Sequence, residues 1–146
     1  RRTLLAHDGP SRANFTPLKN TAATPASGLT AAVASLQPLQ QQYDLALLGM
    51  GADGHFASLF PGMVDLAQWL AEGNAERLVA VPAPSTAPPP VPRLSMTAAE
   101  IKRSRNIVLV LQGEEKMRVL EQAALAGDAL MLPVRALGRV EVIWCP

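Results

Sequence analysis

The sequence is poor in cysteine and in net charge, and it lacks long hydrophobic runs. Its one cysteine, Cys145, excludes an internal disulfide and fits a reducing compartment, so we expect a cytoplasmic protein. The formal net charge is +1 and the 13 basic residues are scattered, which provides no basic stripe for nucleic acid. Apolar runs such as Ile107–Leu111 are far shorter than the roughly 20 residues that span a bilayer. We expect neither a nucleic-acid nor a membrane partner, and the oligomeric state stays open.

The length and the apolar content indicate one domain. Apolar residues form 49% of the 146 residues, which is enough for a sizeable core. Nothing at the N-terminus resembles a signal peptide, and Arg1–Leu5 looks like the end of an amphipathic helix without its beginning. We therefore expect residues 1–146 to form a single α/β domain that is the C-terminal portion of a longer chain.

Strand-like runs alternate with helix-like segments. The expected strands are Tyr43–Leu48, Asn106–Leu111 and Val140–Trp144, whose continuous apolarity predicts parallel strands covered on both faces. The expected helices are Ser27–Leu36, a short helix that begins with a capping box at Thr97–Glu100, and Glu114–Ala126 with a Met117, Leu120, Ala124 stripe before Gly127. The proline-rich Ala83–Pro92 is expected to be an irregular surface connection. This alternation predicts an α/β fold with a mainly parallel sheet.

The most informative segment is Asp44–Gly62, in which an expected strand runs into a glycine loop. Gly49, Gly51 and Gly54 allow the backbone to turn sharply and to approach a ligand closely. At the carboxyl end of a strand, such a loop commonly forms part of a binding crevice. The glycine spacing also matches a dinucleotide fingerprint, but the helix and the later acidic residue that this fingerprint needs are missing.

His55 follows the last of these glycines and is the candidate catalytic residue. An imidazole titrates near neutral pH and can take a proton from water, and Asp53 is close enough in sequence to fix its tautomer. The alternative is a loop histidine that only hydrogen-bonds to backbone, which is also how we interpret His7. Two basic residues suit an anionic group. Arg93 precedes the predicted helix cap, and Lys116 lies at a strand-to-helix turn, although either can be an ordinary surface charge.

Five segments together resemble the 6-phosphogluconolactonase family. They are, in sequence order, FTPLKN (15–20), GMGADGHFASLFPG (49–62), PRLSMT (92–97), QGEEK (112–116) and PVRAL (133–137). The resemblance implies a three-layer α/β/α fold of the type shared with glucosamine-6-phosphate deaminase and ribose-5-phosphate isomerase. It also implies a glycine-rich phosphate loop and an acidic–arginine motif further N-terminal, and the sequence contains neither.

The resemblance implies a hydrolase that converts 6-phosphogluconolactone to 6-phosphogluconate in the pentose phosphate pathway, without metal or organic cofactor. His55 would then be the general base and Asp53 its orienting partner, while Arg93 and Lys116 would bind the substrate phosphate. Gly49, Gly51 and Gly54 would complete the substrate site, and we expect backbone N–H groups around Gly49–Gly51 to stabilise the oxyanion.

Two other functions stay open at this point. Glucosamine-6-phosphate deaminases share the glycine–histidine loop but resemble one another in a glutamate five residues after the histidine, where this sequence has Phe60. Phenylalanine cannot transfer a proton, so this position favours the lactonase. A non-catalytic module that binds a sugar phosphate would keep Arg93 and Lys116 but would have no use for Asp53 and His55.

Overall fold

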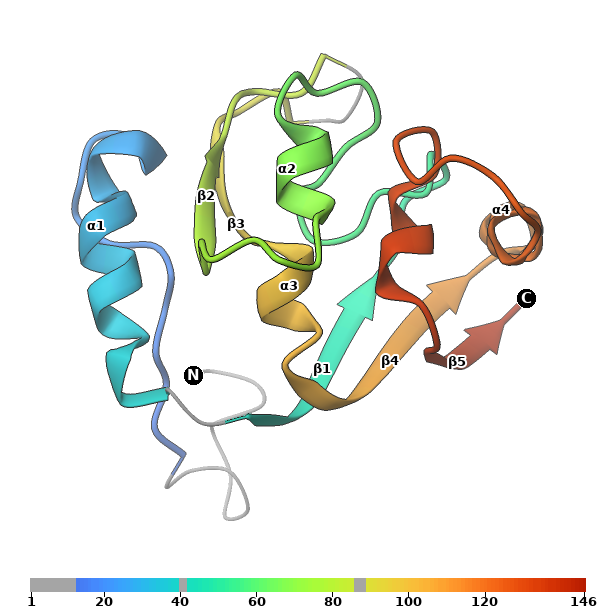
Figure 1. Ribbon diagram of the computed structural model, residues 1–146, viewed down its shortest axis with the longest axis horizontal. Coiled ribbons are helices and arrows are strands. Elements are labelled where there is room, and N and C mark those ends of the chain that lie inside the picture. Colours follow the sequence, from blue (N-terminus) through green and yellow to red (C-terminus); the bar gives the residue numbers. More distant parts are fainter. Residues whose placement is uncertain (1–12, 40–41, 86–88) are drawn as a thin grey trace.

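The computed structural model describes residues 13–39, 42–85 and 89–146, so Arg1–Leu5 and His7 lie outside the described residues. The elements follow one another as α1 (Pro25–Ser35), η2 (Gln37–Leu39), β1 (Tyr43–Gly49), α2 (Leu66–Leu70), β2 (Leu78–Val81), β3 (Arg93–Met96), α3 (Ala98–Ile101), β4 (Ser104–Gln112), α4 (Glu114–Ala124), η3 (Pro133–Leu137) and β5 (Glu141–Cys145) (Figure 1). None of these helices is long and apolar enough to cross a membrane.

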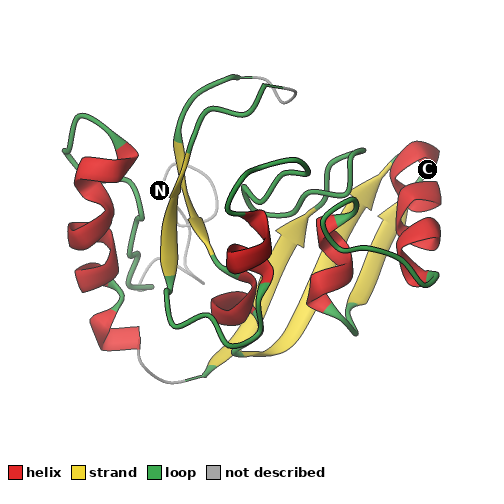
Figure 2. Ribbon diagram, turned by 45° about the horizontal axis from the view of Figure 1, so that its top comes forward, coloured by secondary structure: helices red, strands yellow, loops and turns green. Residues whose placement is uncertain are grey.

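The main sheet has three parallel strands in the order β1-β4-β5 (Figure 2). These are the three strands that the apolar runs predict, each within two residues of its expected bounds. Because parallel strands require crossover connections, helical segments lie between them in sequence. The α/β class with a mainly parallel sheet and flanking helices is confirmed.

A second sheet consists of β2 and β3 in antiparallel register, with Leu78 opposite Met96 and Val81 opposite Arg93. Helix α1 packs against this pair, through a small cluster of Ala32, Leu36 and Leu78. These two strands were not predicted from the sequence, because each has only four residues and the proline-rich segment separates them. The described parts of that segment are irregular, as expected.

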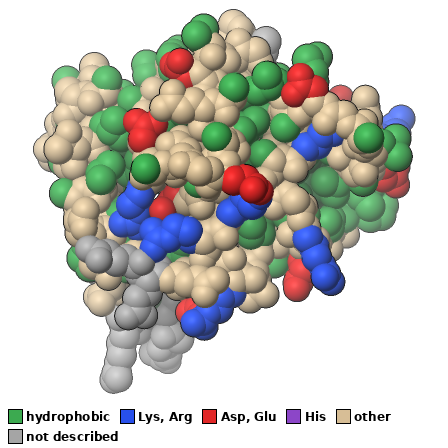
Figure 3. Space-filling model, viewed as in Figure 1, with side chains coloured by type: hydrophobic (Ala, Val, Ile, Leu, Met, Phe, Trp, Pro, Cys, Tyr) green, Lys and Arg blue, Asp and Glu red, His purple; other side chains and the backbone are tan. Residues whose placement is uncertain are grey.

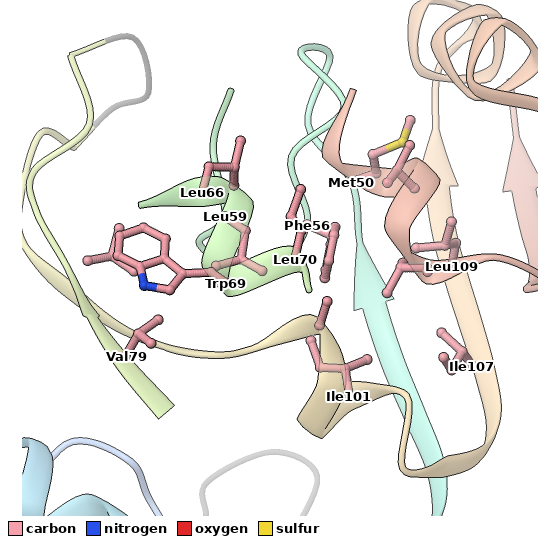
Figure 4. Close-up of a cluster of buried hydrophobic side chains, with 14 of the residues drawn as sticks. Met50, Phe56, Leu59, Leu66, Trp69, Leu70, Val79, Ile101, Ile107 and Leu109 are labelled. Carbon is pink, nitrogen blue, oxygen red and sulfur yellow. The ribbon is translucent and has the colours of Figure 1, made fainter. Parts of the chain in front are cut away.

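One face of the parallel sheet carries the main core. Figure 4 shows Met50 and Phe56 of the loop after β1 pointing into this core together with Ile107 and Leu109 of β4. Phe56 and Leu109 have no exposed surface, and Trp69 of α2 closes the far side of the core. Burial on this scale contributes about 25 cal/mol for each Å² of apolar surface removed from water. Apolar residues of the loop after β1 are therefore part of the main core.

The opposite face of the sheet is open in the described residues. Leu45 and Leu47 of β1 are 54% and 64% exposed, and their neighbours Val110 and Ile143 are also exposed. Register places these side chains on one face, since aligned residues of parallel strands point the same way. Among the described residues, the expectation that the strands are covered on both faces is therefore wrong: α2, α3 and α4 pack on the core side, and α1 packs on the β2–β3 pair.

The helix caps explain where α1 and α3 begin. Thr24 and Ser27 form a complete capping box at α1, in which each side chain accepts a hydrogen bond from the other residue's N–H. At α3, Thr97 accepts a hydrogen bond from the N–H of Glu100 at 3.1 Å. The second half of that predicted box is wrong, because the N–H of Thr97 donates to the Arg77 carbonyl and Glu100 turns towards charged partners.

Helix α4 begins directly after Gly113 and ends at Ala124, two residues earlier than expected. Its core contacts come from Val119, Leu120 and Ala123. Of the predicted stripe only Leu120 is confirmed as a core contact, and Ala124 is exposed. The spacing is helical as predicted, but the face that packs on the core is that of Val119, Leu120 and Ala123.

Candidate active site

The glycine loop leaves β1 at the carboxyl edge of the parallel sheet and folds back on itself. The N–H of Gly51 donates to the His55 carbonyl at 2.9 Å, and the N–H of Gly54 donates to the Gly51 carbonyl at 3.0 Å. Gly54 has φ of 75°, a conformation that glycine adopts at little cost. The tight loop predicted from the glycines is thus present, and it places Asp53 and His55 side by side.

Asp53 and His55 form the most direct polar contact of the loop. Asp53 Oδ1 lies 2.5 Å from His55 Nδ1 and also accepts a hydrogen bond from the His55 backbone N–H at 3.1 Å. A carboxylate can only accept, so Nδ1 of a neutral His55 carries the proton and Nε2 has the lone pair. The side chains are 24% exposed for His55 and 37% for Asp53, which leaves the pair within reach of a ligand.

Gly51 is required by this pair. A Cβ at position 51 would lie 2.2 Å from His55 Nδ1 and 2.6 Å from Asp53 Oδ1, closer than real contacts allow. Gly54 is buried, and a Cβ there would come within 2.9 Å of a Leu132 methyl carbon. At Gly49 the space around a Cβ is open among the described residues. Gly51 and Gly54 therefore shape the loop, whereas the geometry does not require glycine at position 49.

Arg93 is brought to the same place from a distant part of the sequence. It is the first residue of β3, and its guanidinium carbon lies 5.2 Å from the centre of the Phe60 ring. The same ring lies 4.2 Å from the His55 ring, centre to centre. Arg93 also donates a hydrogen bond to the Pro89 carbonyl at 2.8 Å. His55 and Arg93 are therefore joined through one aromatic side chain.

A cavity of about 450 Å³ lies beside Arg93, between β3 and the segment that leads into α1. Lys19 and Asn20 line it together with Arg93, and His55 does not. Lys19 and Asn20 are not among the site residues predicted from the sequence. The one available signal was their position in FTPLKN, a segment that carries the family resemblance.

Lys116 lies in the first turn of α4, just beyond the carboxyl end of β4. Because β4 is the parallel neighbour of β1, this puts Lys116 on the same edge of the sheet as the glycine loop. Within the described residues, Lys116 has no hydrogen bond or ion pair. Of the predicted residues, the contacts in the structure bring together Gly51, Asp53, Gly54, His55 and Arg93, and Lys116 shares with them only its position at the same edge of the sheet.

No three or more His, Cys, Asp or Glu residues gather where they could hold a metal ion, as far as the described part of the chain extends. On the face that Figure 3 shows, acidic side chains lie among the basic ones, so no continuous basic stripe is present there.

A second polar cluster lies at the other end of the strands. The Glu100 carboxylate accepts hydrogen bonds from Arg77, from Arg103 and from the Tyr43 hydroxyl, which is 2.5 Å away. Burial by itself would raise the pKa of Glu100, but the hydrogen bonds from Arg77, Tyr43 and Arg103 outweigh it and lower that pKa. Burial and the neighbouring Glu100 carboxylate raise the pKa of Tyr43, so its hydroxyl stays protonated and donates.

This α/β domain carries a histidine loop at the carboxyl edge of a parallel sheet, the edge at which proteins of the open α/β class commonly bind ligands. Within this class, the family described as glucosamine-6-phosphate isomerases/6-phosphogluconolactonase matches residues 1–144, and the chain belongs to it. A 6-phosphogluconolactonase of Rhizobium meliloti is 32% identical over 97% of this chain and 62% of its own length. One of Caulobacter vibrioides is 41% identical over 70% of this chain and 44% of its own length.

Solved structures agree with this assignment. The crystal structure of a 6-phosphogluconolactonase from Shewanella baltica OS155 superposes with a TM-score of 0.87 at 36% identity, over 98% of this chain and 61% of that one. A monomeric glucosamine-6-phosphate deaminase, with a TM-score of 0.61 at 21% identity, shares the fold. The chain thus spans at most about three-fifths of the length of these lactonases.

Proposed function

We propose that this chain is part of a cytoplasmic 6-phosphogluconolactonase. The reaction is the hydrolysis of 6-phospho-D-glucono-1,5-lactone to 6-phosphogluconate, a step of the pentose phosphate pathway, without metal or organic cofactor. The observation that carries the proposal is the Asp53–His55 pair, with 2.5 Å between Oδ1 and Nδ1, on a loop at the carboxyl edge of the sheet. The family membership and the lactonases among the relatives support it.

His55 acts as the general base in this proposal. Because Asp53 holds the proton on Nδ1, Nε2 takes a proton from water while the water oxygen attacks the lactone carbonyl. The ring C–O bond of the tetrahedral intermediate then breaks, and the proton on the imidazole passes to the leaving ring oxygen. Such general base catalysis typically contributes about 10²- to 10⁴-fold in rate.

Backbone amides of the glycine loop are the proposed donors to the developing oxyanion. The N–H of Gly51 already donates to the His55 carbonyl, so we assign this role to neighbouring amides. One candidate is the N–H of Ala52, which is an exposed residue. The Gly49 amide stays in the proposal as the other candidate, since it lies where β1 ends.

Arg93 and Lys116 are the proposed phosphate ligands. A guanidinium offers two parallel N–H donors to a phosphate, and Lys116 adds a point charge at the start of α4. The carbonyl carbon C1 and the phosphate-bearing carbon C6 of the substrate are the two ends of its carbon chain, and both C1 and C5 adjoin the ring oxygen. A base and a phosphate site that are separated by one aromatic side chain suit a ligand of this shape.

Phe60 distinguishes this reaction from the deamination of glucosamine 6-phosphate. It is the fifth residue after His55, is 1% exposed and lies against the His55 ring. A buried phenyl group cannot exchange protons with a substrate, whereas ring opening and amine loss need more acid and base groups than lactone hydrolysis.

The test follows proton release from freshly generated 6-phosphogluconolactone by the complete gene product, with the uncatalysed rate subtracted. We expect His55→Ala to lower kcat by about 10²- to 10⁴-fold, with an unchanged unfolding midpoint because the imidazole is partly exposed. Equal rates for wild type and variant would remove His55 as the base. Binding of 6-phosphogluconate without turnover by the wild type would instead indicate a sugar-phosphate-binding module, and ammonia release from glucosamine 6-phosphate would indicate the deaminase.

A further inference from the structure

Phe60 is a buried aromatic residue with an unusual place in the packing. Its exposed fraction is 1%, yet it belongs to neither of the two clusters of buried hydrophobic side chains found among the described residues. Phe56, four residues earlier in the same loop, is also fully buried but lies in the main core. The two phenylalanines therefore have different surroundings, and the contacts of the Phe60 ring with His55 and Arg93 distinguish it from Phe56.

The ring contacts of Phe60 lead to two candidate site residues. His55 lies 4.2 Å from it, centre to centre, with the two ring planes inclined by 39°. The Arg93 guanidinium lies 5.2 Å from the ring centre, within the range in which a cation is attracted to an aromatic ring. The attraction orients a long side chain that otherwise has many rotamers. One rigid ring thus fixes two groups that come from different elements of the fold.

A hydrogen bond holds the same loop against the same strand. The N–H of Ser58 donates to Ser95 Oγ at 3.1 Å, and Ser95 is buried two residues beyond Arg93 in β3. The Ser95 hydroxyl in turn donates to the Met96 carbonyl at 3.0 Å. The loop that carries Phe60 is therefore attached to β3 at a second point, beside the contact between Phe60 and Arg93.

We propose that Phe60 is a positioning residue, which sets the separation between the base His55 and the phosphate ligand Arg93. This inference rests on the proposed function, since it assigns the two ends of the substrate to those two side chains. A ring that contacts both groups couples substrate binding to catalysis. Displacing either group by about 1 Å is enough to cost on the order of 10²-fold in rate.

The variants that test this role are Phe60→Leu, Phe60→Tyr and the matched control Phe56→Leu. Phe60→Leu keeps an apolar side chain but removes the ring, and we expect kcat to fall about tenfold and KM to rise about tenfold. Phe60→Tyr keeps the ring and should restore both constants to within about threefold of wild type. Phe56→Leu should lower the unfolding midpoint but leave kcat and KM within about threefold at temperatures where it is folded.

A double variant separates positioning from general disturbance. If Phe60 acts on KM through Arg93, then Phe60→Leu combined with Arg93→Ala should have the KM of Arg93→Ala alone. Independent effects, in which the two increases in KM multiply, would overturn the proposal. Constants of Phe60→Leu within twofold of wild type would also overturn it.

A measurement that needs no activity keeps the inference distinct from the proposed function. Side-chain ¹⁵N relaxation at Arg93 Nε reports how well the guanidinium is ordered. We expect an ordered Arg93 in wild type, Phe60→Tyr and Phe56→Leu, and motion on the nanosecond timescale or faster in Phe60→Leu. An Arg93 that stays equally ordered in Phe60→Leu overturns the positioning role, even if the wild type hydrolyses the lactone. Loss of order in a protein without lactonase activity would support the role of Phe60 and reject the proposed reaction.

Discussion

Two clusters of acidic and basic side chains lie at opposite ends of β1, and they differ in exposure and in the number of their hydrogen-bond partners. At the amino end, Glu100 is 3% exposed and accepts hydrogen bonds from Arg77, Arg103 and Tyr43. Arg77 also donates to the carbonyls of Leu36 and Leu39, so it ties the end of α1 and η2 to α3. At the carboxyl end, the Asp53 and His55 side chains are hydrogen-bonded to each other and are partly exposed.

The charged side chains around Glu100 stabilise the fold, whereas the Asp53–His55 pair is arranged for proton transfer. The Glu100 carboxylate has protein donors around both oxygens, so nothing is left to offer a ligand. The Asp53–His55 pair uses one nitrogen of the ring internally and leaves the other for a proton. We therefore expect changes in the Glu100 cluster to lower stability and changes in the Asp53–His55 pair to lower activity.

The largest effect is expected for Glu100→Gln. The change removes the charge but leaves Arg77 mostly buried, and breaking a buried pair in this way costs about 3–5 kcal/mol in the free energy of unfolding. Urea denaturation followed by circular dichroism measures the change. The control Glu72→Gln also breaks an ion pair, with Lys102, but the Glu72 side chain is exposed and the midpoint should stay in place. Equal losses in the two variants would contradict the distinction between the clusters.

An intermediate effect is expected for Gly51→Ala. The added methyl group would overlap His55 Nδ1 and Asp53 Oδ1, so the pair must separate, and we expect kcat/KM for lactone hydrolysis to fall about 30- to 100-fold. Gly73→Ala is the matched control, because a Cβ at position 73 meets no described atom within 4 Å. Stopped-flow measurement of proton release gives both values. A Gly51→Ala protein as active as the control would show that the 2.5 Å contact is not needed for turnover.

The smallest effect concerns pH. The pKa of Glu100 is lower in the folded protein than its usual value of 4.5, so the carboxylate favours folding above the unfolded-state pKa. This stabilisation is fully present above about pH 5 and is lost as the pH falls through the folded-state pKa. Urea midpoints measured between pH 7 and pH 3 should fall at the acid end, and fall less in Glu100→Gln. The same acid dependence in both proteins would assign the loss to other carboxylates.

The glycine loop and the three parallel strands were accessible from the sequence, because their signals are local. Continuous apolar runs indicated strands, and Gly51 and Gly54 indicated a loop whose conformation and close contacts do require glycine. Gly49 was also predicted to be needed as a glycine, but a Cβ at this position would meet no described atom within 4 Å.

The antiparallel pair β2 and β3 and the surroundings of Glu100 were not accessible in this way. A strand of four residues has too few positions to show an apolar periodicity, and the segment that connects β2 to β3 is rich in proline. Glu100 was expected to complete a local capping box with Thr97. Its stronger interaction is with the Arg77 guanidinium, a partner 23 residues earlier, which no local pattern contains.

The sequence by itself determined the α/β class, the three parallel strands, the glycine loop and the neighbourhood of Asp53 and His55. These features follow from short-range steric constraints and from the periodicity of apolar residues. Both depend on residues that are close together in the sequence. Only the tertiary structure decided that Arg93, 38 residues after His55, reaches it through the Phe60 ring. It also decided that the Leu45 and Leu47 face of the sheet stays open in the described chain. Contacts between distant segments depend on how the β2–β3 pair packs beside the parallel sheet, where Val79 and Val81 of β2 join the main core. No local pattern in the sequence records this packing, because the hydrophobic effect has no direction and acts between segments that are far apart in the chain.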